Sequence, residues 1–199
     1  MSEEEKEENW KKGYRVWKLG FKEGDPRLKS TYQGTVWEPE EPKKEEIEEL
    51  LGIRPPKEIR SDWKEGEDEP FEKTQKGLYS LKDLEELKRH GFPQAEIVGT
   101  ITPYGKVAHG QTGYRAEKAR VDTLFRKVAP CYICGKPAKV VVRQGEDLFY
   151  LCGLCRKRLE RLVGRLGSSI EEYNLDELLD KLAEIYGAEV VDYPGEESE

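Results

Sequence analysis

The sequence has no long hydrophobic run, only one methionine, and only two histidines and four cysteines among its 199 residues. A membrane-spanning helix needs roughly 18 consecutive apolar residues, and no stretch approaches that length. The first ten residues, MSEEEKEENW, have neither the apolar core of a signal peptide nor an arginine-rich transit pattern. We therefore expect a cytoplasmic protein without a membrane partner, in a compartment where structural disulfides are rare.

Charged residues make up 38% of the chain, and most of them are lysine and glutamate. Together with the scarcity of methionine and asparagine, this composition is compatible with a thermophilic origin. The length fits one or two domains with a buried core.

The net charge of −7 hides four acidic segments and a basic remainder. The acidic segments are residues 1–9, 38–50, 61–73 and 192–199, with net charges of −4, −5, −4 and −4. Residues 118–165 contain twelve lysines and arginines and four acidic residues, a balance of +8. Acidic segments of this kind are typical of solvated tails and loops. Alternatively, they flank and screen a basic surface that contacts the phosphates of nucleic acid.

The segment pattern predicts an α+β protein in which residues 1–9 are a disordered acidic tail and residues 10–127 form a small β-rich α+β module. In that module we expect strands at 14–21 and 31–37, a helix at 43–51, a loop at 53–76, a helix from Ser80 to Gly91, and a β-hairpin of residues 96–102 and 106–109. The pattern of residues 113–125 fits either a strand or a helix. Gly34 suggests a bulge, and Trp63 and Phe71 are candidates to attach the loop to the core.

The C-terminal part is predicted to contain a zinc-binding module at 128–167, a helix and short strand at 168–191, and an acidic tail at 192–199. Within the zinc-binding module we expect a hairpin of residues 138–143 and 148–151 and then a helix at 156–166. The final helix is predicted to begin near Asn174 and to end at Gly187. Its apolar residues recur with helical spacing, as in an amphipathic core helix: Leu175, Leu178, Leu179, Leu182 and Tyr186.

All four cysteines lie within 25 residues, as Cys131-x2-Cys134, seventeen intervening residues, and Cys152-x2-Cys155. This spacing matches that of zinc sites with four cysteine ligands, in which a tight turn directs each pair of sulfurs at one ion. Disulfides are disfavoured by the compartment, and a catalytic zinc site usually includes histidine or a carboxylate. We expect one structural Zn²⁺, with iron in the same cage as the alternative. Gly135 and Gly153 stand where the backbone is expected to turn closely around the metal.

The order of a cysteine pair, a β-hairpin and a second cysteine pair that opens a helix resembles a treble-clef zinc finger over residues 129–166. The resemblance implies that the helix N-terminus carries the last two thiolates, where the helix dipole stabilises negative charge. It implies a fold and a metal ion, since treble clefs serve many different functions.

The helix expected after the second cysteine pair is strongly basic. Its apolar side is predicted to contain Leu159, Leu162, Val163 and Leu166, and the opposite side gathers four cationic residues. The candidate nucleic-acid-binding residues are these four and three from the preceding hairpin: Lys157, Arg158, Arg161, Arg165, Lys136, Lys139 and Arg143. A solvated helix face with no ligand is the alternative interpretation.

A second distinctive segment runs from Gly99 to His109 and continues as Gly113-Tyr-Arg-Ala-Glu117. Together with Gly77-Leu-Tyr79, it gives residues 14–125 a loose resemblance to uncharacterised bacterial, archaeal and phage proteins. These proteins share an aromatic N-terminal segment, a Gly-hydrophobic-Tyr element and a Gly-aromatic-Arg-Ala-Glu element. The resemblance implies a folded module and no particular activity.

This segment offers a base, a hydrogen-bond donor and cationic groups for an anion, in His109, Tyr114, Arg115, Glu117 and Lys118. No nucleophile motif, phosphate-binding loop or carboxylate pair accompanies them. We expect a structural role for these residues, such as an ion pair at a corner of the β structure. A ligand pocket or an active site is the less favoured alternative.

These features together favour a non-enzymatic, zinc-binding factor that associates with nucleic acid or with a ribonucleoprotein through the basic helix face. The alternative is a protein-interaction adaptor or regulator whose acidic segments bind a basic partner or imitate nucleic acid.

Overall fold

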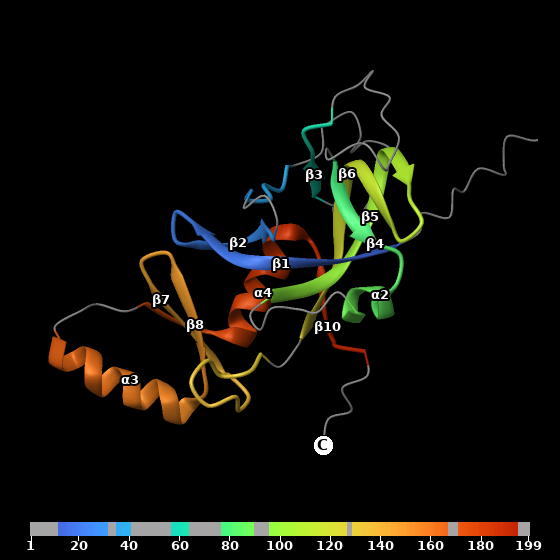
Figure 1. The fold of residues 1–199 in the computed structure, drawn as a ribbon. Coiled ribbons are helices and arrows are strands. Elements are labelled where there is room, and N and C mark those ends of the chain that lie inside the picture. Colours follow the sequence, from blue (N-terminus) through green and yellow to red (C-terminus); the bar gives the residue numbers. More distant parts are fainter. Residues whose placement is uncertain are drawn as a thin grey trace, which may run out of the picture. The chain divides into compact units, whose positions relative to one another are not determined.

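A computed structural model describes residues 12–31, 35–40, 57–63, 77–89, 96–126, 129–166 and 171–194 (Figure 1). The chain divides into two compact units: a first unit of residues 1–15, 38–91 and 99–122, and a second unit of residues 16–37, 92–98 and 123–199. Three long strands contribute residues to both units: β1 (Gly13–Lys22), β5 (Glu96–His109) and β6 (Gly113–Arg126). The predicted tail at 1–9, the helix at 43–51, Gly34 and Phe71 lie outside the described residues.

In the first unit, short strands pair with β6. Strand β4 (Leu78–Leu81) runs antiparallel to β6 through Ala116 to Gly113, and β3 (Glu58–Arg60) runs antiparallel to β6 through Arg120 to Lys118. Strand β3 lies inside the segment 53–76, which was expected to be a loop, so that prediction is wrong at residues 58–60. Trp63 of the same segment is buried in the core, as expected. The buried apolar residues of this part are Ile59, Trp63, Leu78, Leu81, Ala116 and Ala119.

The predicted hairpin of residues 96–102 and 106–109 is wrong, because β5 runs unbroken from Glu96 to His109. Gly105 has a φ of +72°, so the Pro-Tyr-Gly segment distorts the strand locally without reversing it. The backbone N–H of Lys106 donates to Glu117 Oε2 of β6 at 3.2 Å. The chain reverses instead after His109, where Gly110 N donates to Gly113 O at 2.9 Å, and residues 113–126 are strand β6.

Two further element boundaries differ from the sequence prediction. The helix expected from Ser80 begins at Leu84, as α2 (Leu84–Arg89), because Ser80 lies in β4 and Asp83 is the capping residue, its Oδ1 accepting from Glu86 N at 2.6 Å. The strand expected at 31–37 is not observed at its described residues, 31 and 35–37. Strand β1 turns at Glu23-Gly24 into β2 (Asp25–Ser30), and Val36 makes only an isolated bridge.

A buried carboxylate joins several segments of the first unit. Glu58 is only 4% exposed. Its Oε2 accepts a hydrogen bond from Tyr104 Oη at 2.7 Å, and Arg60 pairs with both Glu58 and Glu40. Burial acts to raise the pKa of Glu58, but the Tyr104 hydrogen bond and the charges of Lys118 and Arg60 outweigh it and hold the pKa below its usual value.

The substitution Glu58→Gln is expected to lower the free energy of unfolding at pH 7 by about 1–3 kcal/mol, because it breaks a buried charge pair. A carboxylate with a lowered pKa stabilises the fold above its unfolded-state pKa, and this contribution is lost as the pH falls through the folded-state pKa. The difference in the free energy of unfolding between Glu58→Gln and wild type should therefore become smaller below pH 4.5. Urea unfolding at pH 7 and at pH 3.5 measures this. The exposed, ion-paired Glu85→Gln is the control, and an equal difference at both pH values would contradict the role of the carboxylate.

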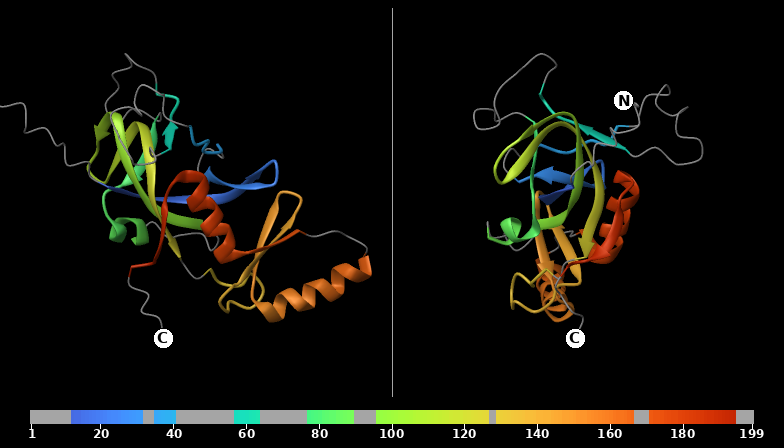
Figure 2. Two further views of the ribbon diagram at one scale, coloured as in Figure 1. Left: turned by 180° about the vertical axis from the view of Figure 1, so that it is seen from behind. Right: turned by 90° about the vertical axis from the view of Figure 1, so that its right-hand side faces the viewer.

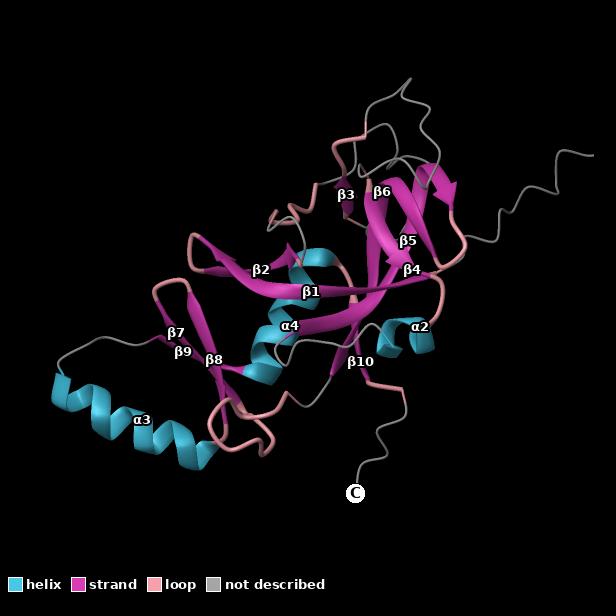
Figure 3. Cartoon of the chain, in the orientation of Figure 1, coloured by secondary structure: helices cyan, strands magenta, loops and turns pink. Residues whose placement is uncertain are grey.

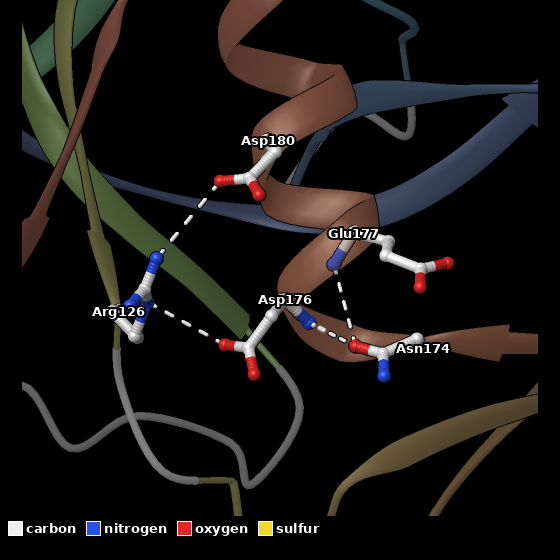
Figure 4. A network of polar contacts seen from close by, with 5 residues as sticks. All are labelled: Arg126, Asn174, Asp176, Glu177 and Asp180. Atoms are coloured by element: carbon white, nitrogen blue, oxygen red, sulfur yellow. Dashed lines mark hydrogen bonds and ion pairs between the residues drawn. The ribbon is translucent and has the colours of Figure 1, made fainter.

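In the second unit, helix α4 (Leu175–Tyr186) packs against β2, and strand β10 (Glu189–Asp192) runs parallel to the last residues of β6. The helix begins and ends as predicted. Asn174 Oδ1 accepts from the backbone N–H groups of Asp176 and Glu177, and Gly187 ends the helix in the left-handed conformation (Figure 4). Arg126 pairs with Asp176 at 3.4 Å and with Asp180 at 3.9 Å.

The hydroxyl of Tyr186 fixes α4 to two backbone groups. It accepts from the N–H of Leu28 at 3.0 Å and donates to the carbonyl oxygen of Trp37. The Trp37 N–H in turn donates to Leu28 O at 2.8 Å, and the Trp37 ring packs edge-on against Trp17. A single buried hydroxyl therefore connects the last turn of the helix to β2 and to the segment that follows it.

We expect Tyr186→Phe to lower the free energy of unfolding by about 1–3 kcal/mol, because a buried N–H and a buried C=O lose their shared partner. Chemical denaturation monitored by tryptophan fluorescence measures this. Tyr132→Phe removes the same hydroxyl from a mostly exposed ring and should change stability by less than about 0.5 kcal/mol. Equal effects of the two substitutions would refute the proposed contact.

Candidate metal centre

The first two cysteines precede, and the last two follow, a hairpin in a small antiparallel sheet of three strands, which Figure 3 shows together with the helix that follows the hairpin. Strands β7 (Val140–Gln144) and β8 (Asp147–Leu151) form the predicted hairpin. A strand that the sequence did not predict, β9 (Glu171–Asn174), pairs with β7, so that β7 is the central strand of the sheet. Helix α3 (Gly153–Leu166) follows β8 directly and begins three residues earlier than expected.

The first cysteine pair lies in a tight turn before β7. Cys131 N donates to Lys136 O at 2.6 Å and Gly135 N donates to Cys131 O at 2.9 Å, which closes the turn. Gly135 has a φ of +73°, a conformation that strains any residue with a Cβ. Tyr132 N donates to Tyr150 O at 2.8 Å, which attaches the turn to β8.

The second pair spans the junction of β8 and α3. Cys152 follows the last residue of β8, and Cys155 lies in the first turn of the helix, where Arg156 N donates to Cys152 O at 2.9 Å. The expected close approach at Gly153 is not observed. A Cβ there would meet nothing within 4 Å, and its φ is not positive. The turn at the second pair is therefore made by the helix itself and does not require glycine.

The four sulfur atoms lie within 4.8 Å of one another, and those of Cys134 and Cys152 are 3.6 Å apart. Four sulfurs at about 2.3 Å from one zinc ion lie about 3.8 Å apart at tetrahedral angles. A disulfide would need about 2.05 Å, and all four cysteines are free. The cluster is therefore suited to hold a single metal ion such as zinc, and its four-sulfur donor set is one that zinc and iron both accept.

The environment of the sulfurs favours ionisation unequally. Burial acts to raise the pKa of Cys131, but backbone N–H groups from both cysteine pairs outweigh it and lower the pKa to about 6. The N–H of Cys155 lowers the pKa of Cys152. Burial and the neighbouring sulfurs raise the pKa of Cys155 to about 12. The protein alone thus offsets the negative charge of only some of the four sulfurs. If all four are thiolates, a bound divalent cation would offset the charge that is left.

A small apolar core supports the cluster. Cys131, Cys152 and Cys155 are buried against Val142 and Leu151 of the hairpin. Val140, Phe149 and Leu159 pack around this group, and the Phe149 ring meets Tyr132 edge-on, with centroids 5.5 Å apart. Small cores of this kind are typical of modules that a metal ion helps to fold.

The structure divides the predicted basic residues into two groups. Lys136, Lys139, Lys157, Arg158 and Arg161 are exposed, and among the described residues none forms an ion pair with them. Arg143 instead pairs with Glu171 of β9 at 3.1 Å and lies over the ring of Phe21. The side chain of Arg165 lies outside the described residues.

The predicted apolar side of α3 is only partly buried. Leu159 packs on the cysteine core as expected, whereas Leu162 is 58% exposed. The side chains of Val163 and Leu166 lie outside the described residues. Three further large apolar side chains at this site are exposed, which was not expected from the sequence: Tyr132, Ile133 and Leu154. Their positions between paired cysteines in the sequence indicate this exposure, because a tight metal-binding turn directs its intervening residues away from the ion.

The candidate pocket residues of the first unit do not converge on one site. The ring of the buried Tyr114 meets the exposed His109 edge-on, with centroids 5.3 Å apart. Arg115 lies over Tyr79, and Glu117 accepts from the backbone of Lys106. Tyr114 lies on one face of β6 while Arg115 and Glu117 lie on the other, since side chains alternate along a strand.

Comparison of the chain with protein-family models, with curated proteins and with solved structures gives no match. The treble-clef resemblance of residues 129–166 and the looser resemblance of residues 14–125 thus remain predictions from the sequence. In the part of the chain that the structure describes, no helix is both long and apolar enough to cross a membrane.

We expect one equivalent of zinc per chain in the purified protein, and loss of ordered structure in the zinc-binding part when a strong chelator removes it. Elemental analysis identifies the metal, and circular dichroism with hydrogen exchange of residues 129–166 follows the structure. The double substitution Cys152→Ser with Cys155→Ser should abolish metal binding, whereas Lys136→Gln, in the first turn, should not. A metal content below about 0.1 equivalent, or unchanged exchange after chelation, would contradict a structural metal site.

Proposed function

We propose that this protein is a zinc-binding factor that associates with nucleic acid, free or within a ribonucleoprotein, through the basic surface of helix α3. We also propose that residues 129–166 form a treble-clef-like module around one structural Zn²⁺. The observation that supports the first proposal most strongly is the exposure of Lys157, Arg158 and Arg161 on one helix in a protein of net charge −7.

The distribution of acidic partners supports this assignment. Arg156, on the same helix, pairs with Glu172 at 2.7 Å and with Glu160 at 3.5 Å, and Arg143 pairs with Glu171. Strand β9 thus neutralises the cations that face the sheet, while Lys157, Arg158 and Arg161 remain exposed to solvent. Exposed cations of this kind contact phosphates and give binding that depends strongly on salt.

In this proposal the metal has a structural role and no catalytic one. The sulfurs of Cys131 and Cys134 belong to the turn before β7, and those of Cys152 and Cys155 belong to the start of α3. One ion bound by all four sets the direction in which α3 leaves the hairpin and so presents the basic surface. The N-terminus of α3 also stabilises the negative charge of the last two thiolates. No step of bond making or breaking is required of the metal.

The alternative of an adaptor that binds through its acidic segments depends on residues 1–9, 38–50, 61–73 and 192–199, most of which lie outside the described residues. Removal of residues 1–9 and 195–199 separates the two proposals, and it leaves Asp192 of β10 and the buried Tyr193 in place. An adaptor of this kind loses its partner, whereas a nucleic-acid-binding protein freed of its own acidic tails binds more tightly.

We expect fluorescence anisotropy with labelled DNA and RNA oligonucleotides to show binding near 50 mM salt that weakens steeply as salt rises. The triple substitution of Lys157, Arg158 and Arg161 to Gln should reduce the slope of log affinity against log salt by about 2–3, because each lost phosphate contact contributes about 0.7–0.9. The matched control removes the same charge elsewhere, by substituting Lys18, Lys88 and Arg89 with Gln, and should leave the slope within about 0.5 of wild type. An affinity that does not depend on salt, or equal slopes for both triple variants, would contradict this function.

A further inference from the structure

The zinc-binding part of the chain exposes large apolar side chains, which are not expected on a surface that contacts only water. Among the described residues, four large hydrophobic side chains are mostly exposed, and all belong to this part: Tyr132 (71%), Leu154 (68%), Leu162 (58%) and Ile133 (56%). Exposed large apolar residues that gather in one place, unlike single scattered ones, mark an interaction surface.

Three of these side chains surround the cysteine cluster. Tyr132 and Ile133 lie between the first two cysteines, and Leu154 lies between the last two. Because the four sulfurs lie within 4.8 Å of one another, the two short turns that carry these residues are neighbours. Figure 2 shows from two further sides that α3 begins beside the loop that precedes β7. We call Tyr132, Ile133 and Leu154 the knuckle surface.

The ring of Tyr132 is held in place although most of it is exposed. Its backbone N–H donates to Tyr150 O at 2.8 Å, and the ring meets Phe149 edge-on at an interplanar angle of 72°. Contact through one edge leaves much of the ring accessible. A preoriented aromatic ring binds a flat partner with little loss of conformational entropy.

The knuckle surface is continuous with the basic surface of α3. Leu154 is separated from Arg158 by four residues and from Arg161 by seven, so these three side chains lie along one side of the helix. Lys136 and Lys157 are exposed nearby in the chain. Apolar and cationic side chains are therefore interleaved, and Glu160, the acidic residue of the described α3 side chains, is paired with Arg156.

We infer that the nucleic acid bound by this protein is single-stranded, with an unpaired base stacked on Tyr132 and the adjoining phosphates on Arg158 and Arg161. This inference rests on the proposed function and specifies the ligand class at the same surface. Single strands present unstacked bases that aromatic side chains bind by stacking, whereas in a duplex the base faces are covered and the knuckle surface would gain no partner. An acidic peptide would use the cations and Leu154, but it would gain little from an accessible aromatic ring.

The test compares a single-stranded oligonucleotide of about 12 nucleotides with a duplex of the same length, using the full zinc-loaded chain. We expect the single strand to bind more tightly. Tyr132→Ala should weaken its binding about 5- to 100-fold and leave the salt slope and duplex binding unchanged, because one stacking contact is lost and no phosphate contact. Tyr132→Phe is the matched control that retains the ring and should bind like wild type.

A second measurement needs no variant and so does not depend on the folding of Tyr132→Ala. An oligonucleotide that carries the fluorescent base 2-aminopurine should change its emission on binding to the wild-type protein, because stacking on an aromatic ring alters its fluorescence. Equal affinity for single strand and duplex, or wild-type affinity of a folded, zinc-containing Tyr132→Ala, overturns this inference and leaves the proposed function intact. Absence of salt-dependent binding to either form, or binding only to an acidic amphipathic peptide, overturns both.

Discussion

The cost of holding four cysteine sulfurs within 4.8 Å of one another as thiolates is the constraint on which the C-terminal part of this protein depends. Backbone N–H groups compensate part of the charge, as the lowered pKa of Cys131 shows, while the raised pKa of Cys155 shows that the protein does not compensate all of it. A divalent cation bound by all four sulfurs would turn this cost into a cross-link between the turn before β7 and the first turn of α3. The direction of the helix would then follow from the ion rather than from a large apolar core.

The uneven burial of α3 is consistent with that constraint. Leu159, one turn beyond the cysteines, packs on the small core, but Leu162 is exposed. Among the described side chains of α3, the buried contacts thus lie toward its N-terminal end, at Cys155 and Leu159. Exposed apolar side chains beside exposed cations are costly in a monomer in water, and their retention fits a surface that is covered when the protein is bound to its ligand.

Features that depend on local chemistry could be predicted from the sequence, whereas those that depend on pairing between distant segments could not. The cluster of four cysteines, the β7–β8 hairpin and the ends of α4 near Asn174 and at Gly187 are local, and the sequence predicts them. The unbroken course of β5 through Gly105 depends on β6, and the assignment of Ser80 to a strand depends on its pairing with Tyr114. Likewise, the loss of Arg143 from the basic surface depends on β9, an element whose polar sequence carries no strand pattern.

The position of β9 affects how this part of the protein can be divided. A fragment that ended at residue 167, directly after α3, would contain all four cysteines and the basic helix. It would leave β7 as an open sheet edge, able to pair with another chain. It would also remove the carboxylates of Glu171 and Glu172, so that two more cations faced solvent. Such a fragment is expected to bind polyanions, and other copies of itself, more readily than the intact chain. Strand β9 lowers both tendencies, because it covers the edge of β7 and pairs with two cations.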